Sequence, residues 1–413
     1  MRITSTLKIP PLSSVWICLA FVCLLVLAQL QMVYAGNLDK LNNLIGDQDA
    51  VLVVDPQGQV LFSKNADRQL IPASTLKILT ALAALRYLGP DYRFITEFYM
   101  DQDDNLIVKG YGDPLLISEV LVDIVAELAA RLDTKPTKIK DLVLDDSYFE
   151  DSIVIPGVTS TYEPYDAPNG ALCVNFNTVY FKRNNSGAYV SAEPQTPLLP
   201  FIVNRIRLSK MNRGRIVLSR EDNESTLYAG HLLLYFMKQQ GIHISGRIRT
   251  GVARKESDRL IFRYLSGFSM AQVISKLFEY SSNFVANQIG IAAGANVYGP
   301  PGTLSKGVRA LSTFAEDILN LTNINIVEGS GISRENRISA QNLHIILEAF
   351  LPNHRLMHRE GRAFFKTGTL SGINTRAGYI ENRAGGLYRF VVMVNTPGKS
   401  ADPIMKILLN NLD

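Results

Sequence analysis

The stretch that most constrains this chain is residues 71–88, IPASTLKILTALAALRYL. Apolar residues recur there at helical spacing, and Gly89-Pro90 ends the run. On a helix, residues three apart share one face, so the Lys77 ammonium can reach the Ser74 hydroxyl. A lysine can take the proton of a serine hydroxyl when burial or nearby positive charge lowers the lysine pKa. The stretch therefore predicts a helix that presents an activated serine.

The Ser-x-x-Lys spacing is not specific by itself. Ser5-Thr6-Leu7-Lys8 repeats the same tetrapeptide close to the N-terminus. An ordinary helix start accounts for Ser74 and Lys77 equally well on this evidence alone. The hypothesis of a nucleophile therefore depends on which other reactive groups the chain carries.

Two later motifs carry polar groups that such a pair needs. Ser281-Ser282-Asn283 is expected at the end of an apolar helix, where the hydroxyl can relay a proton and the amide can donate and accept hydrogen bonds. Lys366-Thr367-Gly368 is expected on an edge strand, where an ammonium and a hydroxyl can receive a carboxylate. The alternatives are a solvated helix end and an ordinary exposed strand. Ser63-Lys64-Asn65 and Arg249-Thr250-Gly251 are partial matches that show how weak each motif is alone.

Residues 1–35 are typical of an export signal peptide. Arg2 and Lys8 precede an apolar run over residues 15–30, and Val33-Tyr34-Ala35 fits the pattern before a cleavage site. We expect a periplasmic or otherwise extracytoplasmic protein with at most peripheral membrane association, because the run is short for a membrane span. An uncleaved anchor is the alternative.

The composition excludes several other classes of protein. Cys18 and Cys23 lie in the leader, so the mature chain keeps only Cys173 and forms no intramolecular disulfide. The formal charge of +4 over 413 residues indicates no nucleic-acid partner. His354 and His358 are four apart without a following Glu or a third ligand, so we expect no metal. No phosphate-binding glycine loop suggests a cofactor.

The pattern of predicted helices and strands changes twice along the chain. Residues 50–63 read as two strands around a turn, ahead of the Ser74 helix, and helices followed by strands return from Met270 to the end. Residues 96–262 instead show short strand-like runs, such as 243–249, and two helices, over 118–132 and 226–240. We expect an α/β (α+β) protein in which residues 36–95 and 263–413 form one domain. The mainly β, α+β region at 96–262 would be an insertion with room for two lobes.

In order along the chain, the three motifs match the signature of serine acyl-transferases of the penicillin-binding and β-lactamase type. The chain resembles dacB-type D-alanyl-D-alanine carboxypeptidases, the soluble class C penicillin-binding proteins with an insertion in the penicillin-binding domain. Further stretches carry the resemblance, which spans about residues 51–395: Gly110-Tyr111-Gly112-Asp113-Pro114-Leu115, Leu144-Asp145-Asp146-Ser147-Tyr148-Phe149, Pro164-Tyr165-Asp166-Ala167-Pro168-Asn169-Gly170-Ala171 and Glu328-Gly329-Ser330-Gly331-Ile332-Ser333-Arg334. The interval from Ser74 to Ser281 is more than twice that from Ser281 to Lys366, which agrees with an insertion.

The resemblance implies a β-lactamase/transpeptidase-like domain, with an antiparallel sheet flanked by helices, and a role for each motif residue. Ser74 would attack peptidoglycan stem peptides ending in D-Ala-D-Ala, with Lys77 as base and Ser281 as proton relay. Asn283 would hold the peptide. The substrate carboxylate and backbone would be received by Lys366, Thr367, Gly368 and Thr369, the last through an oxyanion hole shared with the Ser74 N–H. β-Lactam antibiotics would acylate the same serine and inhibit the enzyme.

Several positions depart from the family's pattern, and other functions stay open. Asn287 stands where the family commonly has an acidic residue, Ser282 replaces an Asp, and Glu328 replaces an Asp. Cys173 stands where a small or polar residue is usual. We therefore expect different support for the helix after Ser281. The alternatives are a D,D-endopeptidase that cuts cross-links, a β-lactamase, which the long insertion disfavours, and a non-catalytic cell-wall binding protein.

Overall fold

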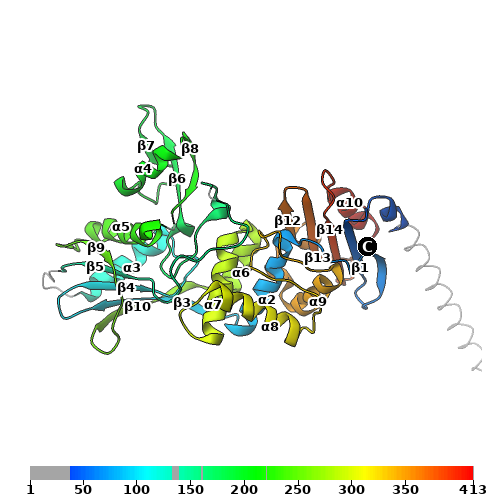
Figure 1. Cartoon of the computed structure of the whole chain (residues 1–413), viewed down its shortest axis with the longest axis horizontal. Helices are drawn as coiled ribbons and strands as arrows, with labels where there is room; N and C mark the ends of the chain where they lie inside the picture. The colour runs from blue at the N-terminus through cyan, green and yellow to red at the C-terminus, as the bar shows by residue number, and fades with distance from the viewer. Residues whose placement is uncertain (1–37, 133–138, 160, 220, 413) are drawn as a thin grey trace, which may run out of the picture.

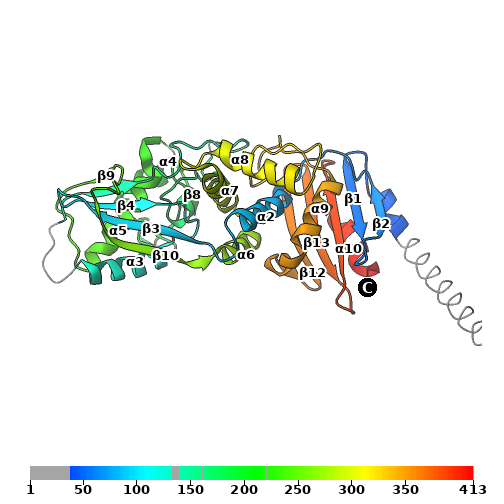
Figure 2. The ribbon, with the colours of Figure 1, turned by 90° about the horizontal axis from the view of Figure 1, so that it is seen from below.

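The computed structural model describes residues 38–132, 139–159, 161–219 and 221–412, so the expected export signal lies outside the described residues. The molecule is elongated, with one sheet at each end and a layer of helices between them (Figures 1 and 2). Within the described ranges, no helix is both long and apolar enough to cross a bilayer.

A six-stranded sheet brings the two ends of the chain together, in the order β11-β12-β13-β14-β1-β2. Its antiparallel strands are β1 (Asp49–Val54), β2 (Val60–Lys64), β11 (Arg359–Glu360), β12 (Ala363–Leu370), β13 (Ile373–Glu381) and β14 (Leu387–Val394). β1 is buried on both faces. Because side chains alternate along a strand, Ala50 and Leu52 pack with the helical layer whereas Val51 and Val53 pack with α10 (Asp402–Asn411).

The helical layer carries the residues of interest. The short helix η2 (Ala73–Leu76) leads into α2 (Lys77–Tyr87), an almost wholly buried helix. The other helices of the layer are α6 (Met270–Tyr280), α7 (Asn283–Tyr298), α8 (Leu304–Thr313) and α9 (Ala340–Phe350). α7 is buried from Phe284 to Ala295, which explains why its sequence is apolar on every side.

The intervening part of the chain forms a five-stranded sheet, in the order β10-β3-β4-β5-β9. β3 (Arg93–Met100), β4 (Leu106–Gly110) and β10 (Arg259–Ser269) are antiparallel, whereas β5 (Leu142–Asp145) and β9 (Ile248–Thr250) join in parallel. The helices α3 (Ser118–Arg131) and α5 (Glu224–Gln239) pack on this sheet around a second apolar core. β10 leads directly into α6, so this part is tied to the helical layer.

A small lobe stands out from this part at the top of Figure 1. It consists of β6 (Thr178–Arg183), β7 (Tyr189–Ser191) and β8 (Arg213–Val217), in the order β7-β6-β8, with the short helix α4 (Val203–Leu208). Buried residues of the lobe, including Phe181 and Ile216, join the core of the five-stranded sheet.

The expected fold class is confirmed: an antiparallel sheet flanked by helices, with a further α+β part. One local expectation was wrong. Residues 243–247 form no strand beyond a single bridge from Ile244 to Ile139, and β9 comprises only Ile248–Thr250. Ser281 lies at the end of an apolar helix, as expected: it follows α6 with a left-handed backbone (φ 54°), and the Ser282 side chain caps the next helix, α7. The domain boundaries at 96 and 262 stay a prediction, and the strands of the second sheet lie between Arg93 and Ser269.

Two glycines of α7 allow a matched test of helix packing. A Cβ on Gly294 would overlap the backbone of Lys306 and Gly307 in α8, whereas a Cβ on Gly290 would meet its nearest neighbours, Leu311 and Thr80, at 3.8 Å. We expect Gly294→Ala to lower the free energy of unfolding by about 1–3 kcal/mol through overpacking. Gly290→Ala should leave it unchanged or raise it by up to about 1 kcal/mol, because alanine favours the helix. Urea unfolding of both variants checks this, and equal effects would contradict the packing described.

Candidate active site

The side chain of Lys77 connects three distant segments of the chain. Its Nζ lies 2.8 Å from Ser74 Oγ, 2.8 Å from Asn283 Oδ1 and 2.7 Å from the Ser330 carbonyl oxygen. Lys77 is fully buried, whereas Ser74 and Asn283 are half-buried. The structure therefore brings together two of the motifs, and adds a carbonyl group that motif reasoning missed.

The surroundings of Lys77 favour its neutral form. Burial is the largest cause that places the pKa of Lys77 well below its ordinary value, and the positive charge of Lys366 lowers it further. The Glu328 carboxylate acts in the opposite direction. A neutral amine has two N–H groups and one lone pair. The carbonyl groups of Asn283 and Ser330 can only accept, so they take the two N–H groups and leave the lone pair facing Ser74 Oγ.

A sharp backbone turn places Ser74 at the pocket. Ala73, immediately before it, has φ 48°, a left-handed conformation that costs an alanine about 1–2 kcal/mol. Two hydroxyl groups hold the preceding residue, since Thr75 Oγ1 and Thr375 Oγ1 donate to the Pro72 carbonyl oxygen at 2.7 and 2.8 Å. The strained turn is thus fixed by contacts from both η2 and β13.

The carbonyl group of Ser330 is positioned by a buried carboxylate. Glu328 accepts hydrogen bonds from the backbone N–H groups of Ser330 and Gly331, both at 2.6 Å, and also from the Ser330 hydroxyl at 2.6 Å. Further donors are Asn336 Nδ2 at 2.7 Å and Asn287 Nδ2 at 3.2 Å. A charged group that is fully buried requires such saturation.

This arrangement explains one departure from the family pattern. Asn287, on the buried face of α7, also accepts from the Gly329 N–H at 2.7 Å, so its amide links α7 to the loop that holds Lys77. From α2, Thr80 Oγ1 donates to the Gly329 carbonyl at 2.6 Å. Glu328 and Ser330 were visible in the sequence only as part of a family-like run, because nothing local to that run indicates that it meets Lys77.

β12 packs against η2, the short helix that carries Ser74. It pairs with β13 along its length, whereas β11 covers only Ala363 and Phe364 on its other edge in the described sheet. A Cβ on Gly368 would lie 2.9 Å from the Ser74 backbone nitrogen, so the strand and the turn at Ser74 are in close contact. Thr367 and Thr369 are exposed on this open edge. The edge can therefore pair with an extended peptide next to Ser74.

Lys366 lies on β12 with its ammonium folded against the strand. Only 2% of the residue is exposed, and Nζ donates to the Thr367 carbonyl at 2.6 Å and approaches Thr367 Oγ1 at 3.5 Å. Burial, and then the nearby charge of Arg376, lower the pKa of Lys366 to about 8. Because no carboxylate pairs with it in the described part of the chain, the ammonium has donor capacity for an anionic ligand.

Ser281 occupies the break between α6 and α7. It is half-buried and its left-handed backbone directs the chain into Ser282 and Asn283 at the start of α7. Among the residues the structure describes, no hydrogen bond joins the Ser281 side chain to Ser74, Lys77 or Lys366. Its place in the pocket thus follows from its neighbour Asn283, and its role stays a prediction.

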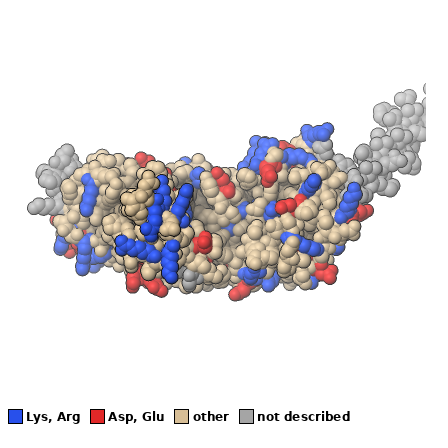
Figure 3. Space-filling model, turned by 90° about the horizontal axis from the view of Figure 1, so that it is seen from above, with Lys and Arg blue, Asp and Glu red and all other residues tan. Residues whose placement is uncertain are grey.

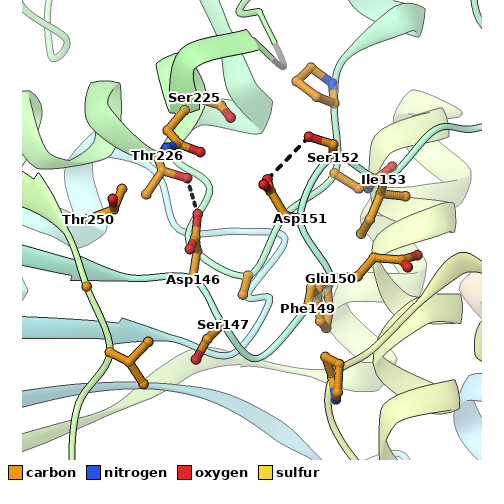
Figure 4. A pocket seen from close by; sticks show the side chains of 18 residues that line it. Asp146, Ser147, Phe149, Glu150, Asp151, Ser152, Ile153, Ser225, Thr226 and Thr250 are labelled. Carbon is orange, nitrogen blue, oxygen red and sulfur yellow. Dashed lines mark hydrogen bonds between the residues drawn. The ribbon is translucent and has the colours of Figure 1, made fainter.

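A separate cavity of about 520 Å³ lies between the inserted part and the helical layer (Figure 4). It is lined by Asp146, Glu150 and Asp151 together with several hydroxyl groups, and by no lysine or arginine. Thr226 Oγ1 donates to Asp146 at 2.6 Å, and Ser152 Oγ to Asp151 at 3.3 Å. None of the residues of the three motifs lines this cavity, so it is distinct from the Ser74 pocket.

Comparison with known proteins agrees with this geometry. The model of the D-Ala-D-Ala carboxypeptidase 3 (S13) family matches residues 33–209 and 180–359. The chain belongs to this family. A D-alanyl-D-alanine carboxypeptidase from Actinomadura sp. is 26% identical over 83% of this chain and 77% of that protein. The D-alanyl-D-alanine carboxypeptidase DacB of Haemophilus influenzae is 24% identical over 82% of this chain and 83% of its own length.

Solved structures share the fold of this S13 protein. Penicillin-binding protein 4 (dacB) from Haemophilus influenzae has a TM-score of 0.74 at 20% identity, covering 91% of this chain and 98% of that one. The same protein in complex with a β-lactam has a TM-score of 0.68. A predatory endopeptidase from Bdellovibrio bacteriovorus has a TM-score of 0.52 at 16% identity, covering 88% of this chain and 91% of that one.

The Glu328 network predicts a strong effect of a small change. Glu328→Gln keeps the shape of the side chain but places an NH₂ group against N–H donors. We expect the free energy of unfolding to fall by about 2–4 kcal/mol. Glu335→Gln, an exposed change in the same loop, should stay within about 0.5 kcal/mol of the unchanged protein. Denaturant unfolding of both variants provides the measurement, and a Glu328→Gln variant as stable as the control would contradict the network.

Proposed function

We propose that this protein is a serine-type D-alanyl-D-alanine carboxypeptidase that acts on peptidoglycan stem peptides through an acyl-enzyme at Ser74. The observation that carries the proposal is the buried Lys77 amine, whose lone pair is left facing Ser74 Oγ by two carbonyl acceptors. Membership of the S13 family supplies the substrate class. Export by the N-terminal segment would place the enzyme outside the cytoplasm, where that substrate is found.

Acylation begins with proton transfer from Ser74 Oγ to Lys77 Nζ. The oxygen attacks the carbonyl carbon of the penultimate D-alanine, and the backbone N–H groups of Ser74 and Thr369 receive the developing oxyanion. Loss of one such donor typically costs about 3–4 kcal/mol of transition-state stabilisation. The close contact of β12 with the Ser74 turn at Gly368 supports this placement. Ser281 passes the proton to the departing amine as the C–N bond breaks.

The polar groups on β12 select the end of the substrate. Lys366 pairs with the terminal carboxylate, and the exposed Thr367 hydroxyl adds a second donor. Gly368 lets the substrate backbone approach, and the Asn283 amide, which approaches the Tyr165 carbonyl at 3.5 Å, holds the peptide from the other side. Water then attacks the acyl-enzyme and releases the shortened stem peptide. β-Lactams would acylate Ser74 by the same route and hydrolyse slowly.

A D,D-endopeptidase is the second candidate, because the edge of β12 is open beyond Phe364. In that reaction the leaving amine belongs to another stem peptide rather than to free D-alanine. The same catalytic groups serve both reactions. Mass analysis of digested muropeptides separates them: loss of one alanine marks carboxypeptidase action, and conversion of dimers to monomers marks endopeptidase action.

Covalent labelling tests the acyl-enzyme. We expect a fluorescent penicillin to label the protein at one site, and Ser74→Ala to abolish the label because it removes the hydroxyl that faces the Lys77 amine. Ser63→Ala, an exposed serine on β2, is the matched control and should label normally. Gel fluorescence after a fixed incubation is the readout. Label that persists in Ser74→Ala would contradict the assigned nucleophile, and an unlabelled native protein would favour a non-catalytic cell-wall binding protein.

The pKa of Lys366 predicts a pH dependence of substrate binding. The pKa is lowered to about 8, so the ammonium is present below this pH and is lost as the pH rises through it. We expect KM for a peptide with a free terminal carboxylate to rise above about pH 8. Steady-state kinetics between pH 6 and about pH 10 provide the measurement. In the Lys366→Gln variant, KM should already be raised at neutral pH and should not rise further above about pH 8. A variant with the same pH profile of KM as the native enzyme would contradict the role of Lys366 in binding the carboxylate.

A further inference from the structure

Positive charge is concentrated in the small lobe formed by residues 178–217, here called the basic lobe. The segment contains seven lysines and arginines against a single acidic residue, Glu193, although the whole chain has a formal charge of only +4. The rest of the chain is therefore slightly acidic. A field concentrated in this way attracts polyanions to one part of the surface.

Most of this charge is not neutralised within the molecule. Arg205 pairs with Glu224 at 3.2 Å, and Arg215 pairs with Glu193. The five remaining cations are exposed and, within the described part of the chain, form no ion pair: Lys182, Arg183, Arg207, Lys210 and Arg213. Exposed cations that form no ion pair can bind an anion without first giving up an internal carboxylate.

Aromatic rings hold several of these guanidinium groups in place. Arg183 lies 4.4 Å from the Tyr189 ring centroid and donates to its hydroxyl at 2.8 Å. Arg213 donates to the Tyr180 hydroxyl at 3.1 Å, and Arg215 lies 5.2 Å from the Tyr180 ring centroid. Such stacking limits the rotamers of long side chains, which reduces the entropy lost when a ligand binds.

The basic lobe lies beside the Ser74 pocket. The Val217 N–H of β8 donates to the Tyr162 carbonyl at 3.1 Å, and the segment that follows, η3 (Pro164–Asp166), contacts both β8 and α7. Tyr165 in η3 accepts from Asn283 of the pocket. Figure 3 shows the molecule from the side on which the basic lobe stands out. Lysine and arginine side chains, in blue, gather there beside the hollow in the middle of the molecule.

Opposite charges line the nearby cavity. The Asp146 and Asp151 carboxylates point into it, the Glu150 carboxylate accepts from the Leu304 N–H at its side, and no lysine or arginine is among its lining residues (Figure 4). A polyanion would be repelled by this cavity and attracted to the basic lobe. The charge distribution therefore favours binding of such a polymer along the lobe.

We propose that the basic lobe is a docking surface for the carboxylate-bearing peptidoglycan polymer that presents the scissile peptide. This inference rests on the proposed function, because substrate stems that end in free carboxylates make the polymer a polyanion. Binding of neighbouring stems by the lobe would hold the polymer while one stem enters the Ser74 pocket. The lobe thereby favours polymeric over small substrates through effective concentration.

An anionic membrane is a weaker match to this surface. Membrane docking combines basic groups with several inserted apolar side chains. In the described part of the basic lobe, Leu208 is the one large apolar residue that is strongly exposed, at 62%. It lies on α4, which at six residues is too short to present an apolar helix face to a membrane.

The test measures binding apart from catalysis, in the full-length protein carrying Ser74→Ala. Co-sedimentation with isolated peptidoglycan sacculi at low salt compares this protein with a further Arg207→Gln/Lys210→Gln change. Arg86→Gln/Lys406→Gln, two exposed residues outside the lobe, removes the same charge as a matched control. We expect the lobe variant to bind about tenfold more weakly and the control to bind normally, with the difference reduced at high salt. Sacculi whose carboxylates have been converted to amides should bind all three proteins weakly.

Two further measurements complete the test. With Ser74 restored, penicillin labelling and hydrolysis of a small D-Ala-D-Ala peptide should be the same in the lobe variant and the control, which shows that the pocket is intact. Equal binding of lobe variant and control to sacculi would overturn the docking surface, as would preferential binding to vesicles of anionic phospholipid. Failure of the native enzyme to hydrolyse any D-Ala-D-Ala peptide would instead contradict the proposed function, because sedimentation of the Ser74→Ala protein does not depend on it.

Discussion

The burial of one amine organises the functional part of this molecule. Lys77 can lie in the interior because Ser74, Asn283 and Ser330 each offer an oxygen atom at hydrogen-bond distance. These oxygens come from η2, from the start of α7 and from the loop that holds Glu328, so the packing of those segments and the chemistry of the site depend on the same contacts. A buried lysine without such acceptors would be strongly destabilising. Burial instead lowers the pKa of Lys77, as the proposed role of general base requires.

A buried carboxylate makes this arrangement stable. Glu328 gathers donors from its own loop and from α7, so the Ser330 carbonyl is held rigidly toward Lys77. The negative charge also opposes the loss of the Lys77 proton. The pocket therefore balances Lys366, which favours the neutral amine, against Glu328, which favours the ammonium. The opposing effects show that the pKa of the base is set by several segments rather than by burial alone.

The sequence was most informative where local pattern decides the structure. Apolar periodicity placed α3 and α5 within two residues of their observed bounds and indicated a helix in the stretch that forms η2 and α2, and the motif order indicated the family that the comparisons establish. It failed where a single residue or a tertiary contact decides. Residues 243–247 have the composition of a strand but pair only through one bridge, from Ile244 to Ile139. Glu328 could not be recognised as an organiser because its donors are brought to it by folding.

The pairing of β1 with β14 has a consequence for biogenesis. The turn at Ser74 follows β2 directly, yet it needs Gly368 of β12 and Thr375 of β13 as neighbours, and β1 needs β14. A chain that leaves the ribosome N-terminus first therefore exposes Ser74 long before the strands that surround it are made. The contacts that shape the site around Ser74 join residues some three hundred positions apart, and contacts at such long sequence separation form slowly. The hydrolytic capacity of the molecule would then arise only as the last strands join the sheet, which keeps nascent chains inert during synthesis and transit.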